Sequence, residues 1–516
     1  MPELSTRLSA HDTVFLNWER PEQPMHVAEC MVYSGHVTAA DMIEMIEARI
    51  HLLPRYRQKI VAAPFGIANP TWEDDDAFDV RNHVAEMHLD GPGYRILSAT
   101  CGRLYCQLID RHRPMWHLTV LHGYAEDTTV VFLKLHHSMV DGVSSVELIE
   151  VLHDTTPDAP PPAPPRQQWQ PRPIPGPVDR LRDIAADNLD LGLDAVRESI
   201  DLVRAGGISE TIDRAKKVAR AGVDLAPLIL KPLSPTPFNG QIHAKRDFSW
   251  VDLPADEVKA VRTALGGTVN DLVLAVLSGG LGRYMRRHGY DPDGRLLHAM
   301  CPVSVRRKSQ SGAMGNLISM VVVPLHVGET NAGARMHAQH FEMAELKRRG
   351  QADAIYESIS AMKWLPTPMA RLMWKSWPKD YFPMHITSTN VPGPKEPLFL
   401  GKHELLHWYP FGVQWTNNAL FLCTLSYRGR LVLGPVSDPD IVEDVWEFAD
   451  DLYASYAELR EAAGVVARET VTPSEAADLS VPAEPPETPE PTETAAVAEL
   501  PAPAEAARPL TSAAQS

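Results

Sequence analysis

The sequence predicts an α/β protein built from two lobes that are joined by a linker. An apolar, strand-like run at residues 130–135 leads into a helical pattern from Val143 to Leu152, and helix and strand patterns alternate again after residue 255. Between them the chain is rich in proline, which interrupts helices and favours a stiff, extended linker crossing between lobes. We therefore expect an N-terminal lobe, a linker with connecting helices, a C-terminal lobe and a tail, at residues 1–156, 157–240, 241–465 and 466–516 respectively.

Composition narrows the class of protein. A chain of 516 residues with 44% hydrophobic content can bury a large core. Its net charge of -17 argues against nucleic acid as a partner. The five cysteines form no CxxC pair, so we expect a reduced, cytoplasmic setting with neither disulfides nor a cysteine metal site. No apolar run approaches the length of a membrane span, and the N-terminus lacks a signal-peptide core, so we expect neither a transmembrane nor a secreted protein.

The second half of the chain carries clear helix signals. Residues 256–265 read as a helix that ends at Gly266 and Gly267, and Thr268 is a natural N-cap for a second helix through Tyr284. A strand is expected at residues 296–300. Other patterns predict an amphipathic helix over Leu181 to Val203, a rigid turn at residues 391–394, and a disordered tail from about 471, which holds eight acidic residues and one arginine.

The segment His136-His137-Ser138-Met139-Val140-Asp141-Gly142 is the most informative stretch of the chain. It lies on a strand-to-helix turn, where cleft residues are often found. Histidine can take and return a proton near neutral pH, so one of the two imidazoles is a candidate general base for a substrate hydroxyl. Adjacent residues at a strand end point in opposite directions, so only one of them can face the substrate. Asp141 and Gly142 are expected to hold the loop.

Two alternatives account for the same residues. The histidines could bind a metal, although neither a cysteine nor a third histidine lies close by in the sequence. They could also belong to a purely structural loop whose imidazoles are hydrogen-bonded. The Asp-Gly pair at a fixed offset favours a catalytic role over both.

The segment HHSMVDG resembles the HHxxxDG motif of the acyltransferase superfamily that includes chloramphenicol acetyltransferase and peptide-synthetase condensation domains. Other segments are similar to the bacterial wax ester synthase/diacylglycerol acyltransferase family over about residues 4–463. They are Leu8 to Asp12, Phe15-Leu16, Pro24 to Val27, Pro54 to Gln58, Pro114-Met115-Trp116, Gly267 to Asp271 and Thr389 to Pro394.

This resemblance implies two chloramphenicol-acetyltransferase-like lobes with mixed sheets and helices around a central tunnel. It further implies transfer of an acyl group from long-chain acyl-CoA to diacylglycerol, or to a long-chain alcohol, with His137 as general base and His136, Asp141 and Gly142 around it. Acyl-CoA would be a substrate, so no cofactor is expected. The sequence holds no GxSxG nucleophile elbow, so we expect no covalent acyl-enzyme.

Asn270 and Asp271 match a motif that the family needs for activity, and Asn270 is a candidate oxyanion donor. From the residues alone, helix capping and dipole compensation explain both equally well. Pro302, Arg306, Arg307 and the pair Gly315-Asn316 are candidates to line the interface between the lobes.

Rival functions are condensation on carrier-protein thioesters, and a catalytically silent lipid-binding homologue. Substrates that live in membranes also imply a peripheral location, on the inner face of the plasma membrane or on lipid droplets. Residues 362–382 combine Trp364, Trp374 and Trp377 with four cations and one acid. That composition is typical of interfacial segments, although the rings could equally pack in the core.

Overall fold

The computed structural model describes residues 6–160, 162–187, 233–304, 318–361, 384–467 and 472–478, together with positions 367, 369 and 372. All of these belong to one compact unit, residues 1–482. Its smaller elements are α1 (Ala10–Trp18), η1 (Ile50–Leu52), η2 (Pro54–Arg57), β2 (Gln58–Val61), η3 (Pro64–Gly66), β3 (Thr71–Asp74), η4 (Val80–Asn82) and α13 (Pro473–Asp478). Strands β2 and β3 form a separate antiparallel hairpin.

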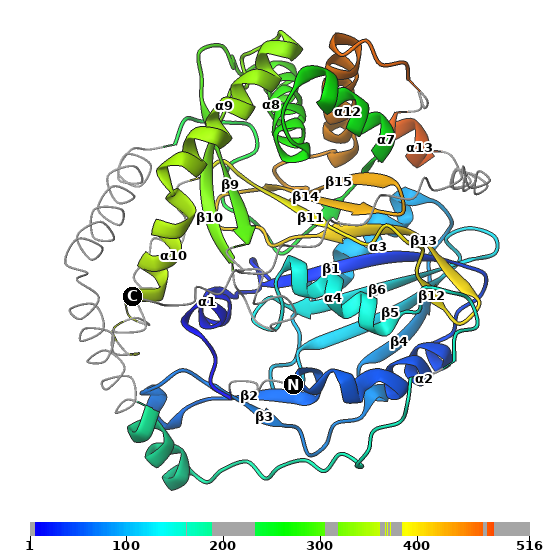
Figure 1. Ribbon diagram of the computed structural model, residues 1–516, viewed down its shortest axis with the longest axis vertical. Coiled ribbons are helices and arrows are strands. Elements are labelled where there is room, and N and C mark those ends of the chain that lie inside the picture. Colours follow the sequence, from blue (N-terminus) through cyan, green and yellow to red (C-terminus); the bar gives the residue numbers. More distant parts are fainter. Residues whose placement is uncertain are drawn as a thin grey trace, which may run out of the picture. The chain divides into compact units, whose positions relative to one another are not determined.

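A six-stranded sheet organises the N-terminal lobe, in the order β12-β13-β1-β6-β5-β4 (Figure 1). Its pairs are antiparallel except β4 with β5, which run parallel. The strands are β1 (His26–Ser34), β4 (Val84–His88), β5 (Trp116–His122), β6 (Thr128–His136), β12 (Phe399–Leu400) and β13 (His403–Phe411), and the lobe's helices are α2 (Ala39–Arg49), α3 (Tyr94–Cys106) and α4 (Gly142–Leu152).

The C-terminal lobe has a mixed sheet in the order β10-β9-β11-β14-β15-β7, with β8 also paired to β15. Strand β11 runs parallel to both of its neighbours, and the other pairs are antiparallel. The strands are β7 (Asp247–Phe248), β8 (Val251–Pro254), β9 (Leu297–Ser304), β10 (Ile318–Leu325), β11 (Ile386–Pro392), β14 (Leu420–Tyr427) and β15 (Arg430–Ser437). The helices are α7 (Ala255–Leu265), α8 (Val269–Arg287), α9 (Ala332–Arg349), α10 (Gln351–Ala361) and α12 (Val445–Ala462). The predicted α/β class with mixed sheets is confirmed.

Strands β12 and β13 come from the second half of the chain, yet they complete the first sheet. Residues 403–411 pair with β1, with Ala28 opposite Phe411 and Met31 opposite Trp408. Main-chain hydrogen bonds therefore join the two lobes. The predicted domain boundaries stay a prediction, but the range 241–465 contributes to both sheets.

Both faces of the N-terminal sheet are buried along its central strands β1, β5 and β6, which explains the nearly continuous apolar run of β6. Along β1, Met31 and Tyr33 point into a core shared with α2 and α4, whereas Cys30 and Val32 point into a core shared with α3 and the second sheet. A third core packs α8, α9 and α12 on the C-terminal sheet, as Figure 1 shows. No single described helix is long and apolar enough to cross a membrane, and the pair α7 and α8, which passes that test together, bends by 90° between the two helices.

The linker and the tail differ in part from expectation. The described part of the linker has no regular structure before residue 177 and runs over the N-terminal lobe, where Trp169 contacts Arg57 and Phe78. Most of the predicted helix over Leu181 to Val203 lies outside the described residues.

The prediction of a disordered tail from about residue 471 is wrong for α13, which packs on α12 and α3. The backbone N–H of Ser474 donates to Asp450 at 3.0 Å. Thr472 and Glu475 form reciprocal cap bonds around Pro473, the proline-first T-x-x-E signature of a helix start. The sequence therefore carried a signal for this helix that composition alone concealed.

Candidate active site

The loop between β6 and α4 holds the histidine motif. Asp141 is the N-cap of α4, and its Oδ1 accepts the backbone N–H of Ser144 at 2.8 Å. A Cβ on Gly142 would lie 2.8 Å from Cγ2 of Val391. Only a glycine allows β11 to approach this closely, and the approach brings the Thr389 to Pro394 segment against the motif. Residues 391 and 392 form the end of β11, so the rigid turn expected there begins only at Gly393.

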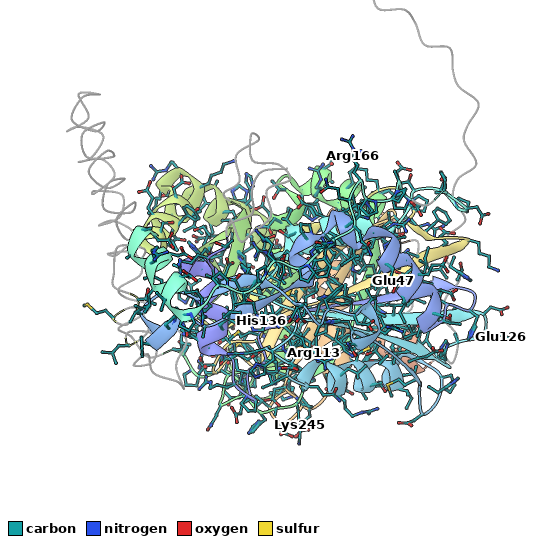
Figure 2. The ribbon with its side chains drawn as sticks, turned by 90° about the horizontal axis from the view of Figure 1, so that it is seen from below. Glu47, Arg113, Glu126, His136, Arg166 and Lys245 are labelled. Carbon is teal, nitrogen blue, oxygen red and sulfur yellow. The ribbon has the colours of Figure 1, made fainter. Side chains whose placement is uncertain are left out.

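The two imidazoles have different surroundings. His136 is buried, and Figure 2 shows it in the interior, while Glu126 and Lys245 lie at the edge. Its Nδ1 accepts the backbone N–H of Ser138 at 3.1 Å, which leaves the ring proton on Nε2. His137 is half-buried and stacks on Phe15 of α1, with ring centroids 3.9 Å apart and planes 8° apart.

Burial keeps the imidazole of His137 in its neutral form. Burial lowers the pKa of His137 to about 4, and the charge of Asp141 opposes that shift. The imidazole is therefore neutral at physiological pH, which is the form that can accept a proton from a hydroxyl.

Behind the motif lies a buried carboxylate that the sequence did not reveal. Oε1 of Glu19 lies 3.3 Å from Nε2 of His136 and 3.2 Å from Nε2 of His26, and Arg111 donates to Oε2 at 2.6 and 2.9 Å. Burial alone would raise the pKa of Glu19, but its interactions with His136 and His26 outweigh burial and hold that pKa well below its usual range. Burial lowers the pKa of His26 to about 4. His136 is thus engaged away from His137.

Backbone carbonyls from two other motif segments fix the histidines. Met115 accepts the N–H of His136 at 3.0 Å, and Met25 accepts the N–H of His137 at 2.8 Å. Trp116 donates its indole N–H to the carbonyl of Tyr56 at 2.9 Å. Three of the segments that carried the resemblance therefore form the frame of the histidine loop. Their spacing in the sequence could not show this, because the contacts join residues 21, 60 and 112 positions apart along the chain.

Asn270 and Asp271 lie in the first turn of α8, as predicted. Oδ2 of Asp271 accepts the backbone N–H of Thr268 at 2.8 Å and lies 2.9 Å from Nδ1 of His340. Asn270 is half-buried. Pro302 lies on β9, whereas Arg306, Arg307, Gly315 and Asn316 fall outside the described residues.

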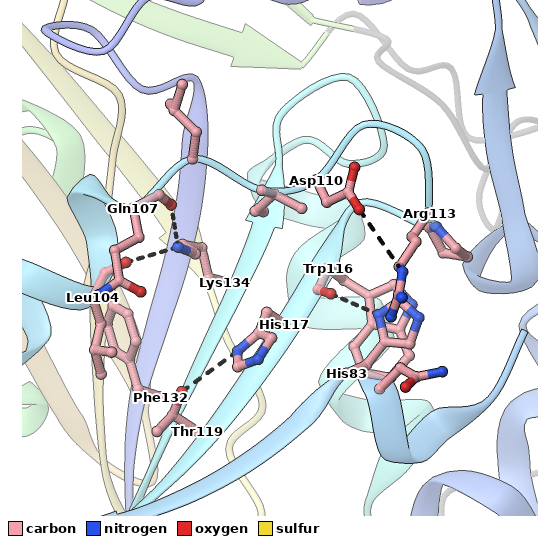
Figure 3. Close-up of a pocket in the computed structure, with 14 residues that line it drawn as sticks. His83, Leu104, Gln107, Asp110, Arg113, Trp116, His117, Thr119, Phe132 and Lys134 are labelled. Atoms are coloured by element: carbon pink, nitrogen blue, oxygen red, sulfur yellow. Dashed lines mark hydrogen bonds and ion pairs between the residues drawn. The ribbon is translucent and has the colours of Figure 1, made fainter.

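A cavity of about 140 Å³ opens on the N-terminal lobe (Figure 3). Lys134 forms part of its wall, donating to the carbonyls of Leu104 (2.7 Å) and Gln107 at the C-terminus of α3. Burial lowers the pKa of Lys134 to about 8 and that of His117, which points into the cavity, to about 4. Neither His137 nor Asp141 lines it. The cavity is therefore not lined by these two motif residues, and the central tunnel stays a prediction.

One group of potential metal ligands occurs in the described part of the chain, far from the histidine motif in sequence. His243, Asp438 and Asp440 place ligand atoms within 4.8 Å of one another. Asp438 accepts the N–H groups of His243 and Asp440, and Lys245 binds Asp440 at 2.7 Å. These contacts hold two loops together.

Comparisons with known proteins agree with the family resemblance of the segments around the histidine loop. Residues 8–273 match the wax ester synthase/diacylglycerol acyltransferase catalytic domain, and residues 314–460 match the C-terminal domain of the same family. Two Mycobacterium tuberculosis proteins named as diacylglycerol O-acyltransferases are each 30% identical, over 88% of this chain and 90% or 99% of their own length.

Solved structures show the same fold. The wax ester synthase/diacylglycerol acyltransferase of Marinobacter aquaeolei VT8 superposes with a TM-score of 0.61 at 23% identity, over 89% of this chain and all of the other. A starter condensation domain of rhizomide synthetase, in complex with C8-CoA, gives 0.54 at 13% identity, over 91% of this chain and 96% of that domain. The chain belongs to the wax ester synthase/diacylglycerol acyltransferase family.

Proposed function

We propose that this protein transfers the acyl group of long-chain acyl-CoA to the free hydroxyl of diacylglycerol, giving triacylglycerol. Long-chain alcohols are a second class of acceptor, giving wax esters. Family membership supports the reaction class, and the names of the mycobacterial relatives support diacylglycerol as the acceptor. The single observation that carries the chemistry is a neutral, half-buried His137 held in place by the stacked ring of Phe15.

In this mechanism His137 is the general base. Its imidazole removes the hydroxyl proton of the acceptor as the oxygen attacks the thioester carbonyl. The new C–O bond forms, the C–S bond breaks, and the imidazolium returns the proton to the departing CoA thiolate. No acyl-enzyme and no cofactor are required, since both substrates react directly.

The neighbours of His137 have positioning roles. Asp141 caps α4, Gly142 permits the contact with β11, and His136 ties the loop to the Glu19 carboxylate. A fixed imidazole matters because misplacement of a base by about 1 Å can cost two orders of magnitude in rate. Asn270 is a candidate donor to the developing oxyanion, and Asp271 orders its helical turn.

The acceptor is insoluble in water, so we propose that the protein works peripherally, on the cytoplasmic face of the membrane or on a lipid droplet. The segment at residues 362–382 that was expected to dock lies almost entirely outside the described residues. Of its described positions, Met369 and Leu372 are 59% and 67% exposed.

Purified protein mixed with labelled acyl-CoA and diacylglycerol tests the proposal, with the product separated by thin-layer chromatography. Labelled triacylglycerol is the expected product. The structural likeness to condensation domains keeps transfer from a carrier-protein thioester as the second candidate. A parallel reaction with an acyl carrier protein as donor separates the two, and no product from either donor would indicate a catalytically silent homologue.

A further inference from the structure

The turn of the β2–β3 hairpin presents an apolar side chain to solvent. Phe65 is 91% exposed, the highest exposure recorded for a large hydrophobic residue in the described part of the chain, and Ile67 is 41% exposed. Phe65 also adopts φ of 53°, a left-handed conformation that is rare outside glycine, asparagine and aspartate. We call residues 64–67 the hairpin tip. Its backbone holds the aromatic ring away from the core.

Two backbone N–H groups of the hairpin tip are paired within the turn itself. The N–H of Gly66 donates to Ala63 at 3.0 Å and that of Ile67 donates to Pro64 at 3.3 Å, while Pro64 has no N–H to satisfy. Unpaired N–H groups are what normally keeps a loop out of a lipid phase. A compact turn with internal bonds can enter the headgroup boundary at little cost.

A second apolar side chain is exposed on the segment beside the hairpin. Arg180 donates to the carbonyl of Ala62 at 2.9 Å, which fixes residues 177–187 next to the base of the tip. Val178, two residues earlier, is 70% exposed. Charges of both signs follow it along the chain, including the ion pair of Arg182 with Asp179. An apolar tip with balanced charge beside it fits a neutral or zwitterionic surface.

Hydrogen bonds connect the hairpin to the segment just before the helix that contacts His137. The N–H of Leu8 donates to Pro70 at 3.0 Å, and that of Trp72 donates to Thr6 at 2.6 Å. The next residue, Ser9, caps α1, whose Phe15 stacks on His137. The tip is therefore attached to the segment that leads to the proposed base.

We propose that the hairpin tip inserts into the lipid surface that supplies the acceptor, a surface with zwitterionic or neutral headgroups. This inference rests on the proposed function only for the identity of the lipid substrate. Insertion is driven by burial of Phe65, with Ile67 and Val178 at the rim. The chain's net charge of -17 disfavours electrostatic attraction to anionic lipid, so binding is insensitive to salt.

Flotation with phosphatidylcholine vesicles containing diacylglycerol tests the inference on the full chain. Phe65→Asn removes the ring but tolerates the left-handed backbone, so the fold is kept. Burial of one phenylalanine corresponds to a factor of about ten to a hundred in partitioning, and Phe65→Asn should lower vesicle binding by at least about tenfold. Phe65→Leu should retain most of the binding. Phe341→Asn is the matched control, because Phe341 is 62% exposed but lies on α9.

An activity assay separates this inference from the proposed function. Phe65→Asn should slow transfer to diacylglycerol in vesicles while leaving transfer to a short, soluble alcohol unchanged. Unchanged vesicle binding by Phe65→Asn would overturn the inference, as would binding that vanishes when the salt concentration is raised tenfold. A change in oligomeric state by light scattering, with vesicle binding intact, would assign the tip to a second copy of the chain instead. If wild-type protein binds vesicles but transfers no acyl group to either acceptor, the proposed function fails and docking stands.

Discussion

The histidine turn before α4 and the Thr-Val-Asn-Asp turn before α8 start their helices in similar ways, but their long-range contacts differ. Asp141 caps α4, and Thr268 with Asp271 forms a capping box on α8. The first turn also meets β11 through Gly142, and its His137 stacks on Phe15. The second turn meets α9 through His340. Capping alone therefore does not distinguish the two turns, whereas the identity of the segments that each turn contacts does.

The largest expected effect is on activity, and it distinguishes His137 from His136 in the histidine turn. His137→Ala should lower acyl transfer by a factor of about 100 to 10,000 with little change in melting temperature, since the half-buried ring is the proposed base. His136→Ala should lower activity less and stability more, because it leaves the buried carboxylate of Glu19 without one of its partners. Initial rates and thermal melts of both variants test this. Near-normal turnover by folded His137→Ala protein would end the assignment.

A buried carboxyl group beside α4, that of Glu29, is expected to make the stability of the protein depend on pH. Glu29 accepts the indole N–H of Trp408 at 2.6 Å, and burial raises the pKa of Glu29 to about 7. An acid whose pKa is raised on folding binds its proton more tightly in the folded state. Its contribution to stability is therefore present below the unfolded pKa, near 4.5, and is lost as pH rises to about 7.

Glu29→Gln should remove this pH-dependent loss of stability, because an amide does not ionise. Its oxygen can still accept the indole N–H of Trp408. The variant should be more stable than wild type above pH 7, by up to about 3 kcal/mol, and similar at pH 4.5. Denaturant unfolding at a series of pH values measures the difference. Parallel pH profiles of the two proteins would show that Glu29 titrates normally.

The glycines beside the two turns should respond differently to alanine. A Cβ on Gly142 would meet a side-chain atom of Val391 at 2.8 Å, whereas Gly267 has φ of 112° and its Cβ would meet Met336 at 2.9 Å. Each substitution should cost about 1–3 kcal/mol. Val391→Ala should restore much of the loss in Gly142→Ala, because the conflict is steric. Met336→Ala should not rescue Gly267→Ala, because backbone conformation remains unfavourable there. Equal rescue at both sites would mean that the two turns are alike.

Sequence reasoning was strongest where the signal is local. The helix start at Thr268, the turn at residues 136–142 and the α/β class follow from capping residues and periodicity, and the structure has them. The mixed sheets were implied by the family resemblance alone. Glu19 and the pairing of β13 with β1 were missed, because each depends on residues that meet only after folding. A glutamate just past a short helix looks like a solvated side chain, and nothing in the sequence near residue 403 indicates the strand that it joins.

The smallest expected effects on stability come from replacing the two aspartates, Asp141 and Asp271. Removal of a cap typically costs about 0.5–2 kcal/mol, so Asp141→Ala and Asp271→Ala should lower stability by similar amounts. Only Asp141→Ala should also lower kcat beyond what the loss of folded protein explains, because its turn carries His137. Asp141→Asn, which can still cap the helix, should recover stability and much of kcat. Thermal melts with rates per folded molecule measure both quantities. If Asp271→Ala loses activity while its melting temperature is unchanged, the α8 turn also acts on substrate. Asn270 beside it would then become the first residue to test as the oxyanion donor.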